Sequence, residues 1–432
     1  MREAVFSILA YLQQSRRLFS MKQTYNRTLT ACYTGYVVQA IVNNFVPLLF
    51  LTFQNTYHIS MRSITLLITV NFLIQLLVDC LTAGFIARIG YRAAMIIAHA
   101  AAAEGLVCLT FLPEIMPSPF AGLLLSVAIY ALGGGLLEVM LSPIVEALPT
   151  KHKEKTMSLL HSFYCWGHVA VVLISTIFFA LFGLGSWKIM AVLWALVPLY
   201  NLFVFRKAPL CPLVAEDEEG LPLGAVLKKP AFWILMVIMP CAGASEQAVS
   251  QWASTFAEQG LGVSKSIGDL AGPMFFAVCM GSSRLLYGFY GEKLNLRKAM
   301  ILSGALCIFS YCVISLSPLP ALSLLGCGIC GFSVGIMWPG AFSIGASALK
   351  GGGTALFALM ALAGDLGCSG GPSFVGLISA HAGDNLKLGI QAAVIFPALL
   401  MAGVLLIRKA HAEAGSSQKV RSEISQKIEP ET

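Results

Sequence analysis

Five acids and one base lie away from the ends of long apolar stretches of this sequence, where an ionised side chain is costly. A charge in the middle of a bilayer costs about 2.5–3.5 kcal/mol on insertion scales, so such residues must face a cavity or a partner. Burial favours the neutral form of a carboxyl group, so a surplus of acids predicts groups that exchange protons. Sodium ions would also suit these carboxylates. The residues are Asp79, Glu104, Glu138, Glu246, Asp365 and the base Arg284.

Glu138 is the acid that we expect to carry a proton. It lies deep in the stretch 118–148, and Ser142 continues its helical face at i+4. A structural hydrogen bond to a neighbouring helix is the alternative explanation. Asp79 and Asp365 are the other proton-coupling candidates, although Asp79 would serve equally well as a structural partner. We predict that Arg284 neutralises Asp365, because an unpaired buried guanidinium would be too costly.

Polar side chains recur at helical spacing on two further apolar stretches, 29–53 and 231–257. Amides and carboxylates hydrogen-bond hydroxyl groups, and an indole offers a ring face, so these stripes suit a sugar-like solute. Hydrogen bonding between helices is the alternative. A histidine in the stretch 157–183 either joins this site, relays protons or is simply hydrogen-bonded. The predicted solute-binding residues are Gln39, Asn43, His161, Glu246, Gln247, Gln251 and Trp252.

The elements that carry these residues are long apolar helices, six on each side of an acidic loop. Hydrophobic residues make up 57% of the chain and charged residues 11%. A bilayer core about 30 Å thick needs roughly 20 apolar residues in a helix. Backbone groups in lipid must pair internally, so we predict helices rather than isolated strands. The predicted spans are 29–53, 64–87, 93–113, 118–148, 157–183, 186–205, 231–257, 266–290, 298–317, 319–348, 353–380 and 386–407.

The predicted fold class is an all-α membrane protein with twelve transmembrane helices in two six-helix bundles. A shift of 204 residues aligns Gly84 with Gly288 and Asn43 with Gln247, which indicates duplicated halves of like orientation. The expected divisions are a cytoplasmic segment 1–28, a bundle 29–206, a cytoplasmic loop 207–229, a bundle 230–408 and a disordered tail 409–432.

The basic residues predict the orientation. Of 28 Lys and Arg, 23 lie in the two tails and the even-numbered loops, four (Arg62, Lys188, Lys265 and Lys387) lie on the opposite side, and Arg284 lies inside a span. Both termini are therefore expected on the cytoplasmic side of a cell membrane. Either Met1 or Met21 could be the first residue of the protein. The net charge of +7 reflects basic loops beside anionic headgroups, not nucleic acid.

The short loop after the second span carries a known pattern. Gly84, Arg88, Gly90 and Arg92 resemble the Gly-x-x-x-Asp-Arg-x-Gly-Arg motif of the major facilitator superfamily, without its Asp. The resemblance implies a secondary transporter that works by alternating access, in which these residues form a gating loop.

A narrower resemblance rests on spans one, four and five. The run from Gly133 through Glu138 to Pro143, followed by the run from His161 to Gly167, looks like the fucose/galactose/hexose proton symporter branch. Members of that branch often carry a span-one acid after an Asn-Asn pair, whereas here Asn43-Asn44 is followed by Phe45. The resemblance implies proton-coupled import of a small polar solute, and it favours a sugar as that solute.

Other classes of function fit the sequence less well. The polar stripes count against an exporter of amphipathic compounds driven by proton antiport, and the lack of an appended signalling domain counts against a membrane sensor. No catalytic cluster, nucleotide loop or cofactor motif is visible, and the 12 cysteines suit small buried hydrophobes. We therefore expect a monomeric transporter with no enzyme activity, cofactor or metal.

Overall fold

The computed structural model describes residues 25–149, 153–211, 223–290, 294–349 and 353–407, and over these residues the regular secondary structure is helical. The side chains of residues 82–88 lie outside this description, so the gating-loop predictions for Gly84 and Arg88 do too. The predicted tail 409–432 and most of the segment 1–28 also lie outside the described residues.

The first half of the chain supplies the first six predicted spans. Its first helix covers residues 25–44. The elements that follow are η1 (Val46–Leu49), α2 (Phe50–Tyr57), α3 (Met61–Cys108), α4 (Leu112–Ile115), α5 (Pro119–Glu146), α6 (Lys153–Phe182), η2 (Leu184–Ser186) and α7 (Trp187–Lys207).

The second half supplies the other six. Its elements are α8 (Leu223–Leu227), α9 (Pro230–Ser250), α10 (Ala253–Thr255), η3 (Phe256–Gly260), α11 (Lys265–Asp269), η4 (Leu270–Met274), α12 (Phe275–Tyr290), α13 (Leu296–Leu316), α14 (Pro320–Val334), α15 (Met337–Ala348), α16 (Gly353–His381) and α17 (Leu386–Ala392). A last helix covers residues 395–407.

The predicted spans correspond to these helices, and the all-α membrane fold is confirmed. The second and third spans meet inside α3 at Gly90, where φ is 78°. Glycine adopts this left-handed φ without the steric cost that a side chain brings. Within the described residues, nine helical segments are long and apolar enough to cross a membrane.

Two of the predicted spans are interrupted in the structure. The span 319–348 is interrupted between α14 and α15, whereas α5 and α16 continue through Pro143 and Pro372. The span 231–257 also breaks, after Ser250, and passes through α10 into the π-helical turn η3. Such breaks release backbone carbonyls from helical pairing, and protein side chains can then bind them.

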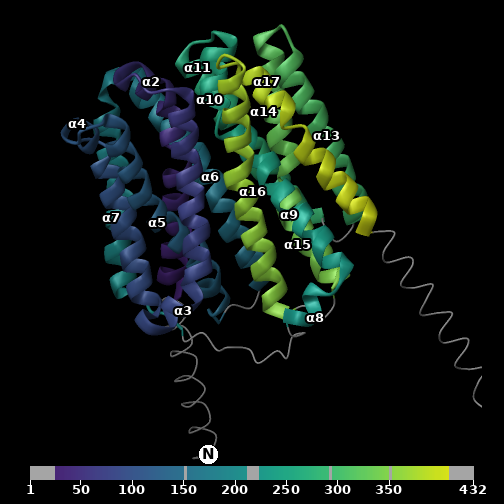
Figure 1. Ribbon diagram of the computed structural model, residues 1–432. Coiled ribbons are helices and arrows are strands. Elements are labelled where there is room, and N and C mark those ends of the chain that lie inside the picture. The colour runs from purple at the N-terminus through teal and green to yellow at the C-terminus, as the bar shows by residue number, and fades with distance from the viewer. Residues whose placement is uncertain (1–24, 150–152, 212–222, 291–293, 350–352, 408–432) are drawn as a thin grey trace, which may run out of the picture. The chain divides into compact units, whose positions relative to one another are not determined.

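The chain divides into two compact units. Unit 1 comprises Met1–His58 with Ile74–Glu216, and unit 2 comprises Ile59–Leu73 with Asp217–Thr432. The first residues of α3 therefore belong to unit 2, where Thr69 Oγ1 lies 2.5 Å from Ser373 Oγ of α16. Within unit 2, α9 runs beside α16 (Figure 1).

Small residues allow close packing within each unit. A Cβ atom on Gly133 of α5 would lie 2.5 Å from the carbonyl oxygen of Ala98 on α3, so only glycine fits there. This glycine therefore lets α5 and α3 pack closely.

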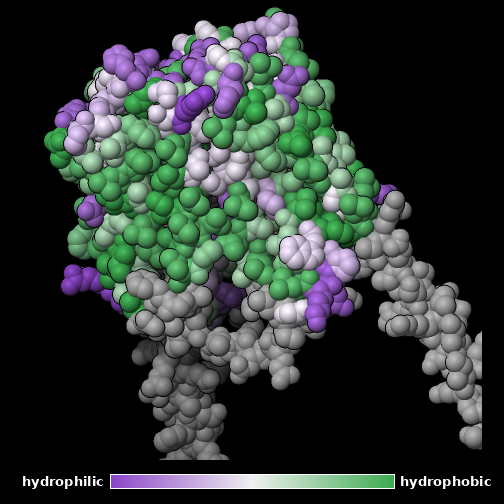
Figure 2. Space-filling model, viewed as in Figure 1, coloured by the Kyte–Doolittle hydropathy of each residue, from purple (hydrophilic) through white to green (hydrophobic). Residues whose placement is uncertain are grey.

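On the face shown in Figure 2, apolar side chains cover the middle of the molecule, and most hydrophilic side chains gather toward its upper and lower ends. Phe289 is 75% exposed, and Leu181 and Leu302 are also largely exposed. Exposed large apolar surfaces of this extent need a hydrocarbon environment rather than water. The protein is therefore a multi-pass membrane protein.

Candidate functional site

Tyr36 joins three helices of unit 1. Its hydroxyl lies 3.1 Å from Ser142 Oγ on α5 and 3.2 Å from His161 Nδ1 on α6. The rings of Tyr36 and His161 meet edge to face, with centroids 5.3 Å apart. His161 was predicted as a solute-binding residue, and Tyr36 lies on the same helix as the predicted stripe of Gln39 and Asn43. The structure brings His161 to that stripe.

Gln39 and Asn43 lie one and two turns beyond Tyr36 on the first helix, and their amide oxygens differ in hydrogen bonding. Asn43 Oδ1 accepts a hydrogen bond of 2.9 Å from Gln75 Nε2 on α3. Gln39 is 3% exposed, and its Oε1 accepts no hydrogen bond from any described residue. A buried carbonyl of this kind calls for a donor, because an unmade hydrogen bond costs about 1–3 kcal/mol.

The predicted proton-coupling acids of unit 1 are both half-buried. Glu138 lies on α5, one turn before Ser142, whose hydroxyl contacts Tyr36. Asp79 lies on α3, one turn beyond Gln75. Glu104 is exposed on α3, unlike Glu138 and Asp79. The coupling roles of these acids stay predictions.

A polar ladder in unit 2 follows the end of α9. Arg284 of α12 forms an ion pair of 3.0 Å with Glu246, and Gln247 Nε2 donates to Glu246 Oε1 at 3.2 Å. Gln251 Nε2 then donates to Gln247 Oε1 at 3.1 Å. The structure therefore connects four of the predicted site residues in one chain of contacts.

A helix end positions the guanidinium of this ladder. The helix α14 stops at Gly335, and the carbonyl oxygen of Gly335 accepts a 3.4 Å hydrogen bond from Arg284 Nε. The sequence predicted Asp365 as the partner of Arg284. The structure shows Glu246 as one partner, and the pairing with Asp365 stays a prediction. Asp365 is buried on α16, the helix that packs along α9.

Trp252 is fully buried in unit 2. Its indole N–H donates to the carbonyl oxygen of Pro372 on α16 at 2.9 Å. This contact links the break after α9 to the proline of α16. The ring face that the sequence assigned to a solute is covered in this conformation, and the solute-binding role stays a prediction.

Arg92 of the predicted gating loop caps a helix. Its Nη1 donates to the carbonyl oxygens of Phe205 and Arg206 at 2.8 and 2.9 Å, and its Nη2 donates to that of Ala208 at 2.8 Å. These carbonyls lie at the carboxyl end of α7, where the helix dipole favours a cation. The loop motif did not reveal this partner.

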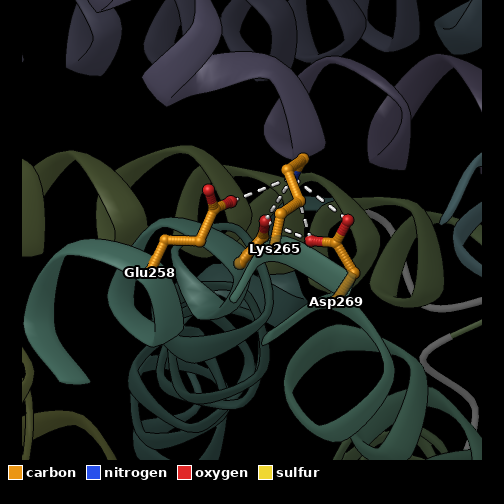
Figure 3. A network of polar contacts seen from close by, with 4 residues as sticks. Glu258, Lys265 and Asp269 are labelled. Atoms are coloured by element: carbon orange, nitrogen blue, oxygen red, sulfur yellow. Dashed lines mark hydrogen bonds and ion pairs between the residues drawn. The ribbon is translucent and has the colours of Figure 1, made fainter. Parts of the chain in front are cut away.

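A second charged cluster lies at the junction of the seventh and eighth spans. Lys265 contacts Glu258, Asp269 and Ser254 (Figure 3). Asp269 is fully buried inside the predicted span 266–290, and it is not among the predicted site residues. The i, i+4 spacing of Lys265 and Asp269 is the signal that could have revealed the pair.

Among the residues that the structure describes, no group of three or more His, Cys, Asp or Glu side chains is placed to hold a metal ion. The 12 cysteines are free thiols, and Cys327 and Cys330 are buried within α14.

The fold resembles several solved transporters. A bacterial homologue of the human lysosomal transporter Spinster, in an inward-facing and unoccupied conformation, has a TM-score of 0.72 at 16% identity, with 90% of this chain and 98% of that chain covered. A D-xylose-proton symporter has a TM-score of 0.68 at 15% identity, with coverages of 90% and 97%. The fucose:proton symporter of E. coli has a TM-score of 0.61 at 16% identity, with coverages of 89% and 99%.

At these identities the similarity concerns the fold. A comparison with curated protein sequences found no match. The family pattern of the Major Facilitator Superfamily matches residues 32–372. This match covers most of the chain and agrees with the all-helical membrane fold and the loop pattern that ends at Arg92. The chain belongs to the Major Facilitator Superfamily, and the protein is a membrane transporter.

Proposed function

We propose that the protein is a proton-coupled symporter that imports a small polar solute by alternating access between its two bundles. Family membership supports transport. The proton-coupled sugar symporters among the similar folds support sugars as the first solute class to test. The positive-inside distribution of Lys and Arg supports a cell-membrane location with both termini cytoplasmic.

The buried amide of Gln39 is the observation that carries the proposal of a polar solute. Its Oε1 accepts no hydrogen bond from a described residue, and it lies one turn from the Tyr36–His161 pair. A hydroxyl or amine of a bound solute would supply the missing donor. An apolar solute would leave this carbonyl unsatisfied, so the amide favours a polar ligand.

Glu138 is the proposed proton carrier. It precedes Ser142 by one turn, and Ser142 contacts the Tyr36 hydroxyl. Proton uptake by Glu138 would therefore change the charge beside the proposed solute site. Asp79 and Asp365 are the alternative carriers. Carboxylates can bind sodium ions as well as protons, so the transport assay tests a gradient of each ion.

Reconstituted protein in liposomes tests the proposal. With an imposed inward proton gradient, the wild type should accumulate a solute from a panel of sugars and other small polar compounds, and an equal sodium gradient should not drive uptake. Glu138→Gln should abolish accumulation while it spares exchange of labelled for unlabelled solute. Glu104→Gln is the matched control, because Glu104 is an exposed acid of α3 that we expect to leave uptake unchanged.

Three results would contradict parts of the proposal. Full accumulation by the Glu138→Gln variant would remove Glu138 as the carrier. Solute efflux driven by the inward proton gradient would identify an antiport exporter, the alternative function. Failure of every polar solute to bind in a thermal-shift screen, with binding of amphipathic compounds, would contradict the solute class.

A further inference from the structure

Lys265 holds together two short helical segments of unit 2. Its ammonium lies 3.0 Å from Glu258 Oε1, 3.0 Å from Asp269 Oδ2 and 3.2 Å from Ser254 Oγ. A lysine has three N–H donors, and here each has an acceptor. The Ser254 hydroxyl in turn donates to Asp269 Oδ1. We call these four residues the Lys265 clamp; Figure 3 shows them converging from both sides of the junction.

The clamp carries one more negative than positive charge, and its two acids are not equivalent. Asp269 is 0% exposed and holds both the ammonium and the Ser254 hydroxyl. Glu258 is 18% exposed and reaches the ammonium through Oε1. Glu258 is therefore the acid that water can reach, and a proton on it would leave the Lys265–Asp269 pair balanced.

The backbone on both sides of the clamp is irregular. Glu258 lies in the π-helical turn η3, and a second π-helical turn, η4, starts directly after Asp269. Gly262 turns the chain between them with a φ of 68°. Turns of this kind are short and recur at functional sites. The ion pair from Lys265 to Glu258 adds a side-chain tie between η3 and α11.

The charged groups around Glu258 are few. The segments α10 and η4 contain no titratable residue, and α11 contributes Lys265 and Asp269. The helix α17 packs against η3 and carries Lys387, whose ammonium donates to the carbonyl oxygen of Ser317 at 3.4 Å. Lys265 is therefore the cation that holds Glu258.

We propose that the Glu258–Lys265 ion pair of the Lys265 clamp is a proton-controlled tie between η3 and α11, which opens when Glu258 takes up a proton. The proton comes from water and neutralises the Glu258 carboxylate, while Lys265 remains an ammonium ion paired with Asp269. The turn η3 then loses its side-chain tie to α11, while Ser254 of α10 stays bound to Asp269. The charge rule places this junction on the non-cytoplasmic side, with Arg62, Lys188 and Lys387, so the tie responds to pH there. The inference goes beyond the proposed transport and needs no coupling through Glu138.

Hydrogen–deuterium exchange of the full chain in lipid nanodiscs tests the tie without a transport assay. Peptides covering residues 253–274 are followed at pH 5 and pH 7.5, with rates corrected for the intrinsic pH dependence of exchange. The wild type should exchange about two- to fivefold faster at pH 5, the range expected when a partly exposed ion pair is lost. Glu258→Gln should exchange at the faster rate at both pH values.

Two further variants serve as controls for the exchange experiment. Glu258→Asp retains the charge and should retain the pH dependence, which separates loss of the proton site from misfolding. Glu114→Gln is the matched control, because Glu114 forms an ion pair with Lys188 in unit 1, in loops that the charge rule places on the same side. It should leave exchange in 253–274 unchanged. Slow exchange of Glu258→Gln at pH 7.5, or wild-type pH dependence in that variant, would overturn the proposal.

Discussion

The carboxylate of Glu246 and the guanidinium of Arg284 form an ion pair of 3.0 Å between α9 and α12. The side chains are 10% and 19% exposed, so water screens the pair only in part. Arg284 also donates to the Gly335 carbonyl at the end of α14. One guanidinium thus ties together three helical segments of unit 2.

Removal of one partner of this pair should destabilise the protein more than removal of both. Glu246→Gln leaves the guanidinium without its carboxylate, and we expect a loss of about 3 kcal/mol in the free energy of unfolding, since breaking a buried pair leaves a charge uncompensated. The double variant Glu246→Gln/Arg284→Met should lose less than Glu246→Gln alone, because no charge is left unpaired. Thermal unfolding in detergent measures both. Additive losses would show that the pair is not coupled.

Replacement of Asp365 tests the partner that the sequence predicted for Arg284. If Asp365 also neutralises Arg284, the effects of Asp365→Asn and Glu246→Gln on unfolding should be strongly non-additive, because both changes act on the same guanidinium. Independent, additive effects would remove Asp365 from this network.

Gln39→Leu should weaken solute binding while it leaves stability nearly unchanged. The amide oxygen has no donor among the described residues, so the substitution breaks no protein hydrogen bond there. Loss of one hydrogen bond to a solute should raise the KM of uptake about three- to tenfold. Asn43→Leu is the contrast, since it removes the acceptor of the Gln75 amide and should lower the melting temperature. Unchanged KM in Gln39→Leu would contradict the proposed site.

Arg92→Gln should destabilise the carboxyl end of α7. Three carbonyl oxygens lose a charged donor, and we expect a loss of about 2–3 kcal/mol. Arg92→Lys should restore only part of it, because an ammonium lacks the planar fork that reaches several carbonyls. Thermal unfolding distinguishes the variants. Equal stability of the Lys variant and wild type would show that charge alone is sufficient.

Gly133→Ala should disturb the contact between α5 and α3. Its Cβ would approach the Ala98 carbonyl oxygen to 2.5 Å, and overpacking of this kind costs about 1–3 kcal/mol. Gly370→Ala on α16 is the matched control, because its Cβ would meet nothing within 4 Å. The first variant should lower the melting temperature, and the second should not.

The sequence predicted the features that depend on residues close together in the chain. The apolar stretches revealed the helices, and the stripes around Gln39 and Gln247 selected residues that the structure places in polar clusters. The loop pattern pointed to the family, but it did not reveal that Arg92 caps α7, because a helix end far along the chain is not encoded in the loop.

Some features could not be read from composition. The Lys265 clamp escaped notice because Glu258 and Lys265 lie near the predicted ends of two spans, where charges are usually solvated. Only the π-helical turns η3 and η4 bring them together with a buried Asp269.

The sequence by itself determined the long membrane-spanning helices, because hydrophobic length is a property read along the chain, and its family pattern over residues 32–372 identified a transporter. The tertiary structure decided which polar groups meet. Glu246 contacts Arg284 and Tyr36 contacts His161 because helix breaks, close glycine contacts and helix rotation set the approach of distant side chains. Those contacts arise only when the helices pack.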